Sequence, residues 1–182
     1  KTGAGSTLVT VTLAFRTTAV QYKTVLGKEE PDVEIFGKFV DQDVPENQVA
    51  ISSDGFFAPA PQNAKAGVDD FLIFQAMVPL KPGRYLAVFA AQDKVAGRVG
   101  TYRETIVVPN LAETDKLSLS SITLAQSVVS HPMTEGEKPS PFQFGSLEVV
   151  QAPDSDFKYT SSLNFYYQVY TSKKDAAGAA SL

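Results

Sequence analysis

The sequence predicts an all-β protein: an immunoglobulin-like antiparallel β-sandwich followed by a second, incomplete β-sandwich segment. In several short segments apolar residues alternate with polar ones, whereas no stretch longer than ten residues repeats its apolar positions with the period of a helix. Sequences that contain Pro or Gly separate these segments, as turns separate strands. Apolar residues make up 43% of the 182-residue chain, which is enough to build a buried core.

The strands expected in the first domain lie between residues 8 and 108. The segments at 71–80 and 85–91 carry apolar residues on both faces, which is typical of central strands. By analogy with sandwiches of this size, we expect about seven antiparallel strands in two packed sheets. The segments with strand character are 8–16, 33–40, 49–52, 71–80, 85–91 and 101–108.

The most informative local signal is a turn at Pro82 and Gly83 that is followed by Tyr85 at the start of a strand. In immunoglobulin-like sandwiches a tyrosine near the start of strand F closes the preceding corner through its hydroxyl. We therefore expect Tyr85 to be buried, with its hydroxyl bonded to the backbone of residues 78–82. The alternative is an ordinary core tyrosine after an ordinary turn.

The sequence pattern beyond residue 108 predicts a division into two domains. Residues 109–116 are polar and break the strand pattern, so we expect a first domain at 1–110, a linker at 111–116 and a second domain at 117–182. The second domain offers three or four strands and ends in a tail of small residues. Its strand-like segments are 117–126, 142–150 and 163–170.

The last of these segments has an apolar face that three strands cannot cover alone. This face carries Leu163, Phe165, Tyr167 and Val169. Either the second domain packs onto the first, or further sequence or another subunit covers it. We favour the second solution, because the linker separates the domains and the small-residue tail is typical of a continuing chain. The hypothesis is that the isolated chain is incomplete and works inside an assembly.

Four segments in this order resemble the tandem sandwich regions of large exported bacterial proteins. They are LKPGRYLAVFAAQDKVAGRVGTYRETIVVPNL, KLSLSSITLAQ, PFQFGSLEVV and LNFYYQVYT, and they cover about half of the chain. The likeness is to proteins in which a von Willebrand-type or GWxTD-type domain is joined to β-sandwich modules. The GWxTD motif itself is absent, since the chain has no Trp. The resemblance implies a scaffolding or adhesion role outside the cytoplasm, in the periplasm or at the cell surface, without catalytic residues.

Composition excludes several classes of function. The net charge of −4 gives no basic surface for nucleic acid. No apolar run approaches the roughly 20 residues that cross a bilayer, so membrane association requires a partner or a further segment. The absence of Cys excludes disulfides and thiolate chemistry, and agrees with export. The chain begins at Lys1 without a signal peptide, so we expect the native N-terminus to lie upstream or to have been removed.

No catalytic, cofactor-binding or metal-ligating residue is predicted. The single histidine, His131, lies in a loop sequence, and no Gly-x-Ser-x-Gly elbow accompanies it. Three pairs of loop aspartates lack the spacing of a calcium loop, so we interpret them as solvated carboxylates. The pairs are Asp41 with Asp43, Asp69 with Asp70, and Asp154 with Asp156.

Tyr166 and Tyr170 share the other face of the last segment and are the candidate interaction face. An aromatic pair of this kind is typical of packing against another domain or chain, which we favour over a sugar-stacking platform because that role usually needs Trp. The leading hypothesis is a non-catalytic structural or protein-interaction module of an extracytoplasmic bacterial assembly, with other protein subunits as partners. The alternatives are a carbohydrate- or ligand-binding module and an accessory domain of an enzyme complex.

Overall fold

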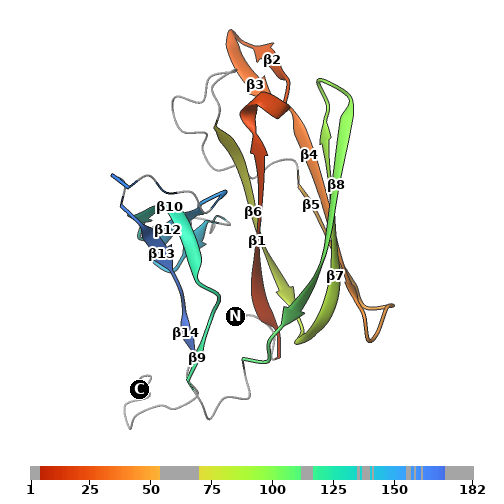
Figure 1. The fold of residues 1–182 in the computed structure, drawn as a ribbon, viewed down its shortest axis with the longest axis vertical. Coiled ribbons are helices and arrows are strands. Elements are labelled where there is room, and N and C mark those ends of the chain that lie inside the picture. The colour runs from red at the N-terminus through yellow and green to blue at the C-terminus, as the bar shows by residue number, and fades with distance from the viewer. Residues whose placement is uncertain are drawn as a thin grey trace.

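The protein is all-β, and its strands form antiparallel sheets in two parts that lie side by side (Figure 1). The computed structural model describes residues 5–53, 70–111, 117–134, 136, 140, 142–154, 157, 159–160 and 162–170. Within these residues the one helical element is the short 3-10 turn η1 (Thr17–Ala19). Residues 112–116 of the predicted linker at 111–116, and the predicted tail of small residues, lie outside the described residues.

The first part is a sandwich of two unequal sheets. A ribbon of two strands faces a sheet of four strands in the order β5-β4-β7-β8. The ribbon consists of β1 (Thr7–Arg16) and β6 (Phe71–Leu80). The four-stranded sheet consists of β4 (Val33–Asp41), β5 (Gln48–Ser53), β7 (Gly83–Asp93) and β8 (Arg98–Val108).

Period-two alternation explains why these strands form the core. Val11 of β1 packs against Phe39 of β4 and Phe89 of β7, and the two phenylalanine rings meet edge to face at 5.7 Å. Further along the sandwich, Phe74 of β6 packs against Val33 and Ile35 of β4. Burying each such side chain contributes about 1.5–3 kcal/mol. The ribbon and the four-stranded sheet therefore share one core.

The prediction was about seven strands in two packed sheets. The structure has six strands in the two packed sheets and two further strands in a separate hairpin. This hairpin joins β2 (Tyr22–Val25) to β3 (Lys28–Pro31) and lies at the end of the sandwich (Figure 1). The sequence pattern does not predict this hairpin. Lys28, Glu29 and Glu30 are polar on both faces of β3, so the segment shows no apolar alternation.

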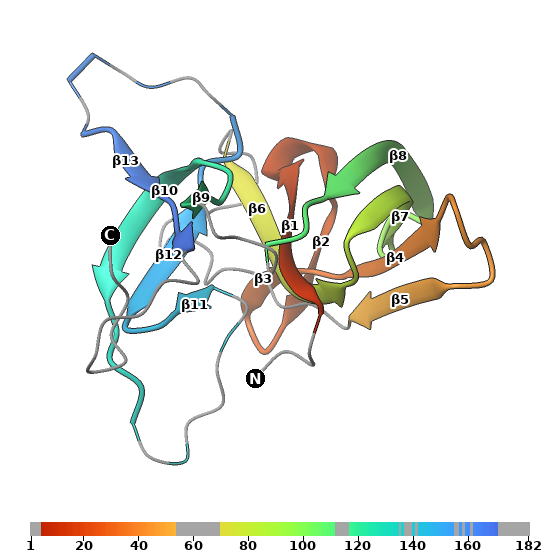
Figure 2. The same cartoon turned by 90° about the horizontal axis from the view of Figure 1, so that it is seen from below.

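The second part is a small four-stranded sheet in the order β11-β12-β10-β13 (Figure 2). A short pair, β9–β14, accompanies it (Figure 1). Ala125, Phe142 and Val149 form its buried side. The strands are β9 (Ser118–Leu119), β10 (Thr123–Ser130), β11 (Gln143–Phe144), β12 (Leu147–Gln151), β13 (Asn164–Tyr166) and β14 (Val169–Tyr170).

The second part has more strands than the three segments predicted, because each segment is interrupted. The segments 117–126 and 163–170 break at the same level. There Ser120 N–H donates to the Gln168 carbonyl, and the Ser120 hydroxyl accepts from the Gln168 N–H, both at 2.8 Å. A side-chain acceptor thus replaces part of the ladder. The segment 142–150 folds back at Gly145, whose φ of 63° suits glycine.

The two parts contact each other through the outer face of the β1–β6 ribbon. Phe142 packs against Ile73, and both side chains are buried. The hydroxyl of Thr12 on β1 donates to Oε1 of Gln151 on β12, at 2.7 Å. Two solutions were considered for covering the small sheet. Packing onto the first part is the one that covers its inner side. Its other side carries the apolar row described below.

Candidate interaction site

The site is built around a cleft of about 700 Å³ between the two parts of the molecule. One wall comes from the start of β1 and the end of β8, and the other from β9, β13 and β14. The wall atoms are both polar and apolar, since Gln75 and Gln151 lie among valine and leucine side chains. The cleft therefore offers apolar contact together with amide donors and acceptors.

Tyr166 and Tyr170, the candidate interaction face, both line this cleft and are both half-buried. The ring of Tyr166 lies 5.0 Å from that of Phe144, at a tilt of 46°. The Tyr170 hydroxyl donates to Oε1 of Gln168 at 2.6 Å. Burial, and secondarily the neighbouring Tyr166, raises the pKa of Tyr170. The pair thus faces the first part of the same chain.

The opposite face of β13 and β14 carries what we call the outer row, defined as Leu163, Phe165, Tyr167, Val169 and Leu119. Leu119 joins this row because it pairs directly with Val169. Each of these side chains is about half exposed, from 46% for Tyr167 to 58% for Leu163. The rings of Phe165 and Tyr167 are nearly parallel, with centroids 6.3 Å apart. The outer row is therefore an ordered apolar surface that faces solvent.

Tyr85 lies in the core of the sandwich and does not line the cleft. Its side chain is 4% exposed, and its hydroxyl donates to the carbonyl of Lys81 at 3.0 Å. This is the burial and the hydrogen bond expected of the corner. Burial, with a smaller contribution from Asp41, raises the pKa of Tyr85. Its place is structural and remote from the two candidate tyrosines.

His131 and Asp41 take part in local structure. His131 follows β10, and its Nδ1 lies 3.4 Å from Oε2 of Glu148. Asp41 Oδ1 accepts the N–H groups of Asp43 and Val44, so this carboxylate closes a turn. Asp69 and Asp156 lie outside the described residues. Among the residues that are described, no group of three His, Asp or Glu side chains gathers as a metal site would require.

Asp93 is a buried carboxylate that the sequence analysis missed. Its Oδ1 accepts the N–H groups of Val95 and Ala96 in the β7–β8 turn, and its Oδ2 accepts that of Gln21. Arg98 lies 3.4 Å from Oδ2. Burial acts to raise the pKa of Asp93, but these hydrogen bonds outweigh it and hold the pKa below its ordinary value. An Asp at the end of a strand, before a Gly-containing turn, was the available signal.

The structure and the comparisons leave the family open. Across the described ranges no helix is long and apolar enough to cross a membrane. The chain matches no protein-family model, no curated protein and no solved structure.

Proposed function

We propose that this chain is a non-catalytic protein-interaction module that works as a subunit or domain of a larger assembly. The single observation that supports the proposal is the outer row, an ordered strip of half-exposed apolar side chains on β13 and β14. Exposed apolar surfaces of this kind mark contact sites with other proteins. Aromatic residues are also enriched where proteins meet, and Phe165 and Tyr167 form the centre of the row.

The position of β13 in its sheet supports the same role. β13 is the terminal strand of the β11-β12-β10-β13 sheet, so among the described residues its outer edge has no strand partner. An unpaired edge beside an apolar face is a template for another strand or sheet. The proposed partner is a protein whose apolar side chains pack on the outer row. The setting proposed with it is an extracytoplasmic bacterial assembly, which agrees with the absence of Cys.

The proposal is tested by removing the aromatic centre of the row. The intact chain and its Phe165→Ser variant are used as bait in an extract of the source, and the partner is identified by cross-linking at the outer row. Tyr159→Ser is the control, because Tyr159 is fully exposed and lies outside the row. We expect the partner to be lost only with Phe165→Ser. Equal recovery by all three folded proteins would overturn the proposal.

A second candidate function is supported by the cleft. Tyr166 and Tyr170 line it together with Gln75 and Gln151, a combination of aromatic and amide groups that suits a carbohydrate or another polar small ligand. A glycan array distinguishes the two functions. Glycan binding that disappears with Tyr166→Ala and persists with Phe165→Ala would replace the interaction proposal. Purification of the intact complex would reveal a catalytic subunit, if the chain is an accessory domain.

A further inference from the structure

A second surface, separate from the outer row and the cleft, lies on the open side of the sandwich. It is a groove of about 300 Å³ between β1 on one side and β7 and β8 on the other. Leu13 and Phe15 of β1 form one wall, and Phe89 forms the floor. Gly100 and Tyr102 of β8 form the remaining wall.

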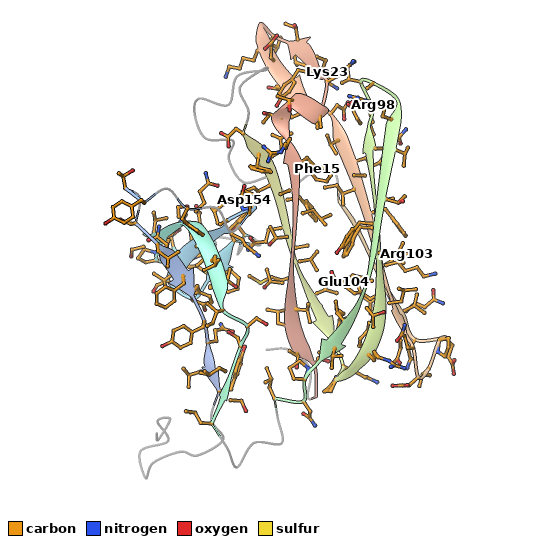
Figure 3. All side chains as sticks on the ribbon, in the orientation of Figure 1. Phe15, Lys23, Arg98, Arg103, Glu104 and Asp154 are labelled. Carbon is orange, nitrogen blue, oxygen red and sulfur yellow. The ribbon has the colours of Figure 1, made fainter. Side chains whose placement is uncertain are left out.

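The inner face of β8 lies open along this groove. Gly100, Tyr102 and Glu104 pair directly with Ala91, Phe89 and Ala87 of β7. Residues paired in this way point to the same side of a sheet, so these three positions of β8 face the sandwich interior. They are nevertheless exposed, and Tyr102 is 58% exposed. Figure 3 shows Glu104 on the side of β8 toward β1, and Arg103 on the opposite side.

The edge of β1 beside the groove has no strand partner among the described residues. β1 pairs with β6 over ten positions, and no third described strand joins the β1–β6 ribbon. An edge of this length presents a row of backbone N–H and C=O groups to any strand that approaches. Beyond the groove, two hydrogen bonds link β1 to β8, one from Thr7 to the Pro109 carbonyl and one from Arg98 to the Ala19 carbonyl.

The space beside β1 admits one strand and excludes a second sheet. β1 and β8 form opposite walls of the groove with β7 as its floor, and β8 is the edge strand next to β7. Neighbouring strands are about 4.8 Å apart and packed sheets about 10 Å apart, so a strand added to β1 would lie directly over β8. A second copy that paired through its own β1 would bring its own β7 into the space that β8 occupies. This geometry selects a single extended segment.

A charge beside the groove defines the occupant further. Glu104 is exposed on the inner face of β8, and the Tyr102 hydroxyl donates to its Oε2 at 2.9 Å. The neighbouring groove residues Leu13, Phe15 and Phe89 are apolar. A complementary strand therefore carries alternating apolar residues on its inner face, with one basic residue at the level of Glu104.

We propose that this groove binds one extended strand of a partner polypeptide, which pairs with the free edge of β1 and covers the inner face of β8. The main-chain hydrogen bonds to β1 supply affinity, and the alternate side chains that face β8 supply specificity. The added strand makes the ribbon three-stranded and covers Tyr102 and Glu104. This proposal goes beyond the interaction at the outer row and depends on different residues.

The probe is a capped eight-residue peptide that alternates Thr with Val and has Lys in place of one Val. It is added to the full chain, and the exchange of backbone amides is followed. We expect slower exchange in β1 and saturable binding. A peptide with Pro at two central positions is the control, because it cannot form the ladder and should not bind.

Two variants place the peptide in the groove. A Cβ at Gly100 would meet no atom within 4 Å, so the side chain of Gly100→Ile enters open space at the groove. It should abolish binding, whereas Thr105→Ile on the outward face of β8 should not. Glu104→Lys should weaken binding of the Lys peptide by about two- to fivefold, as expected for one exposed charge pair. It should strengthen binding of a peptide that carries Glu in place of this Lys. Glu34→Lys makes the same charge change on another strand and should alter the binding of neither peptide.

The outcomes separate this proposal from the interaction at the outer row. Absence of binding, or binding that survives Gly100→Ile with the fold intact, overturns the groove proposal and leaves the Phe165 experiment unaffected. Self-association of the chain through β1, detected by sedimentation and lost in Gly100→Ile, also overturns it, because a second copy would then be the occupant. If only Phe165→Ser loses the partner, the result supports the proposed interaction at the outer row. The groove proposal is then still decided by the peptide experiment.

Discussion

Two tyrosines of the first part differ in what their hydroxyls contact. The Tyr85 hydroxyl donates to the Lys81 carbonyl, and the side chain is almost fully buried. The Tyr22 hydroxyl is buried and has no hydrogen-bond partner within the described ranges. A hydrogen bond of this kind stabilises the fold by about 1 kcal/mol, whereas a buried group without a partner loses its hydration and gains nothing.

Replacing tyrosine by phenylalanine at these two positions should therefore affect the free energy of unfolding differently. Tyr85→Phe should lower the free energy of unfolding by roughly 1 kcal/mol, and Tyr22→Phe should leave it unchanged or raise it by up to about 1 kcal/mol. Chemical denaturation measures both, with Tyr159→Phe as an exposed control. An unchanged midpoint for Tyr85→Phe would argue against the corner.

Asp93 should make stability depend on pH. Its folded pKa lies below that of the unfolded chain, because the hydrogen bonds favour the charged form despite burial. Its stabilisation is therefore complete above the unfolded pKa of about 3.9 and is lost as the pH falls through the lower folded value. Asp93→Asn should destabilise the chain at pH 7, and the difference from the natural chain should narrow below about pH 4. A difference that stays constant down to pH 2 would exclude this linkage.

At the scale of elements, the β2–β3 hairpin contains a strained residue. Leu26 has a φ of 50° and is fully exposed, and Gly27 follows it with a φ of 80°. Two positive φ values in a two-residue hairpin turn favour Asn-Gly, whereas a leucine in this region costs about 1–2 kcal/mol. Leu26→Asn should therefore raise the thermal midpoint of the hairpin and stabilise the chain by roughly 1 kcal/mol. Leu26→Val, which is β-branched, should do the reverse.

Apolar alternation predicted the strands of the sandwich, because each buries one face. The segments 8–16, 33–40 and 71–80 agree with β1, β4 and β6 to within a few residues. The hairpin β2–β3 lacked this signal, since its side chains are mostly exposed. The interruptions near Ser120 and Gln168 come from a side-chain hydrogen bond between segments far apart in sequence. Periodicity within one segment does not contain that information.

At the scale of the whole molecule, Phe142 is the main apolar contact between the parts. It is 4% exposed and packs against Ile73 and Phe71 of β6 and against Val150. Phe142→Ala should lower the free energy of unfolding by about 3–5 kcal/mol, because it leaves a cavity at the contact. Hydrogen exchange should show faster exchange in β10 and β12, with β7 still protected. Uniform loss of protection would show instead that both parts unfold as one unit.

The candidate site could be predicted from the sequence only in part. Alternation separated Tyr166 and Tyr170 from Phe165 and Tyr167 correctly, because strand side chains point to opposite faces. It did not show which face would be covered. That depends on the docking of the second part against β1 and β6, which turns Tyr166 and Tyr170 toward the cleft and leaves the outer row exposed.

The pairing of β1 with β6 also sets an order of events during synthesis. Arg16 pairs with Phe71 and Thr7 with Leu80, so β1 has no sheet partner until β6 has been made. At 5–20 residues per second, the ribosome adds residues 17–80 in about 3 to 13 seconds. β7 and β8, by contrast, are joined by a short turn and can pair as soon as they emerge. During that delay Val9, Val11, Leu13 and Phe15 lack the strand that pairs with β1 in the folded chain. We therefore expect β1 to stay exposed on the nascent chain until β6 has emerged.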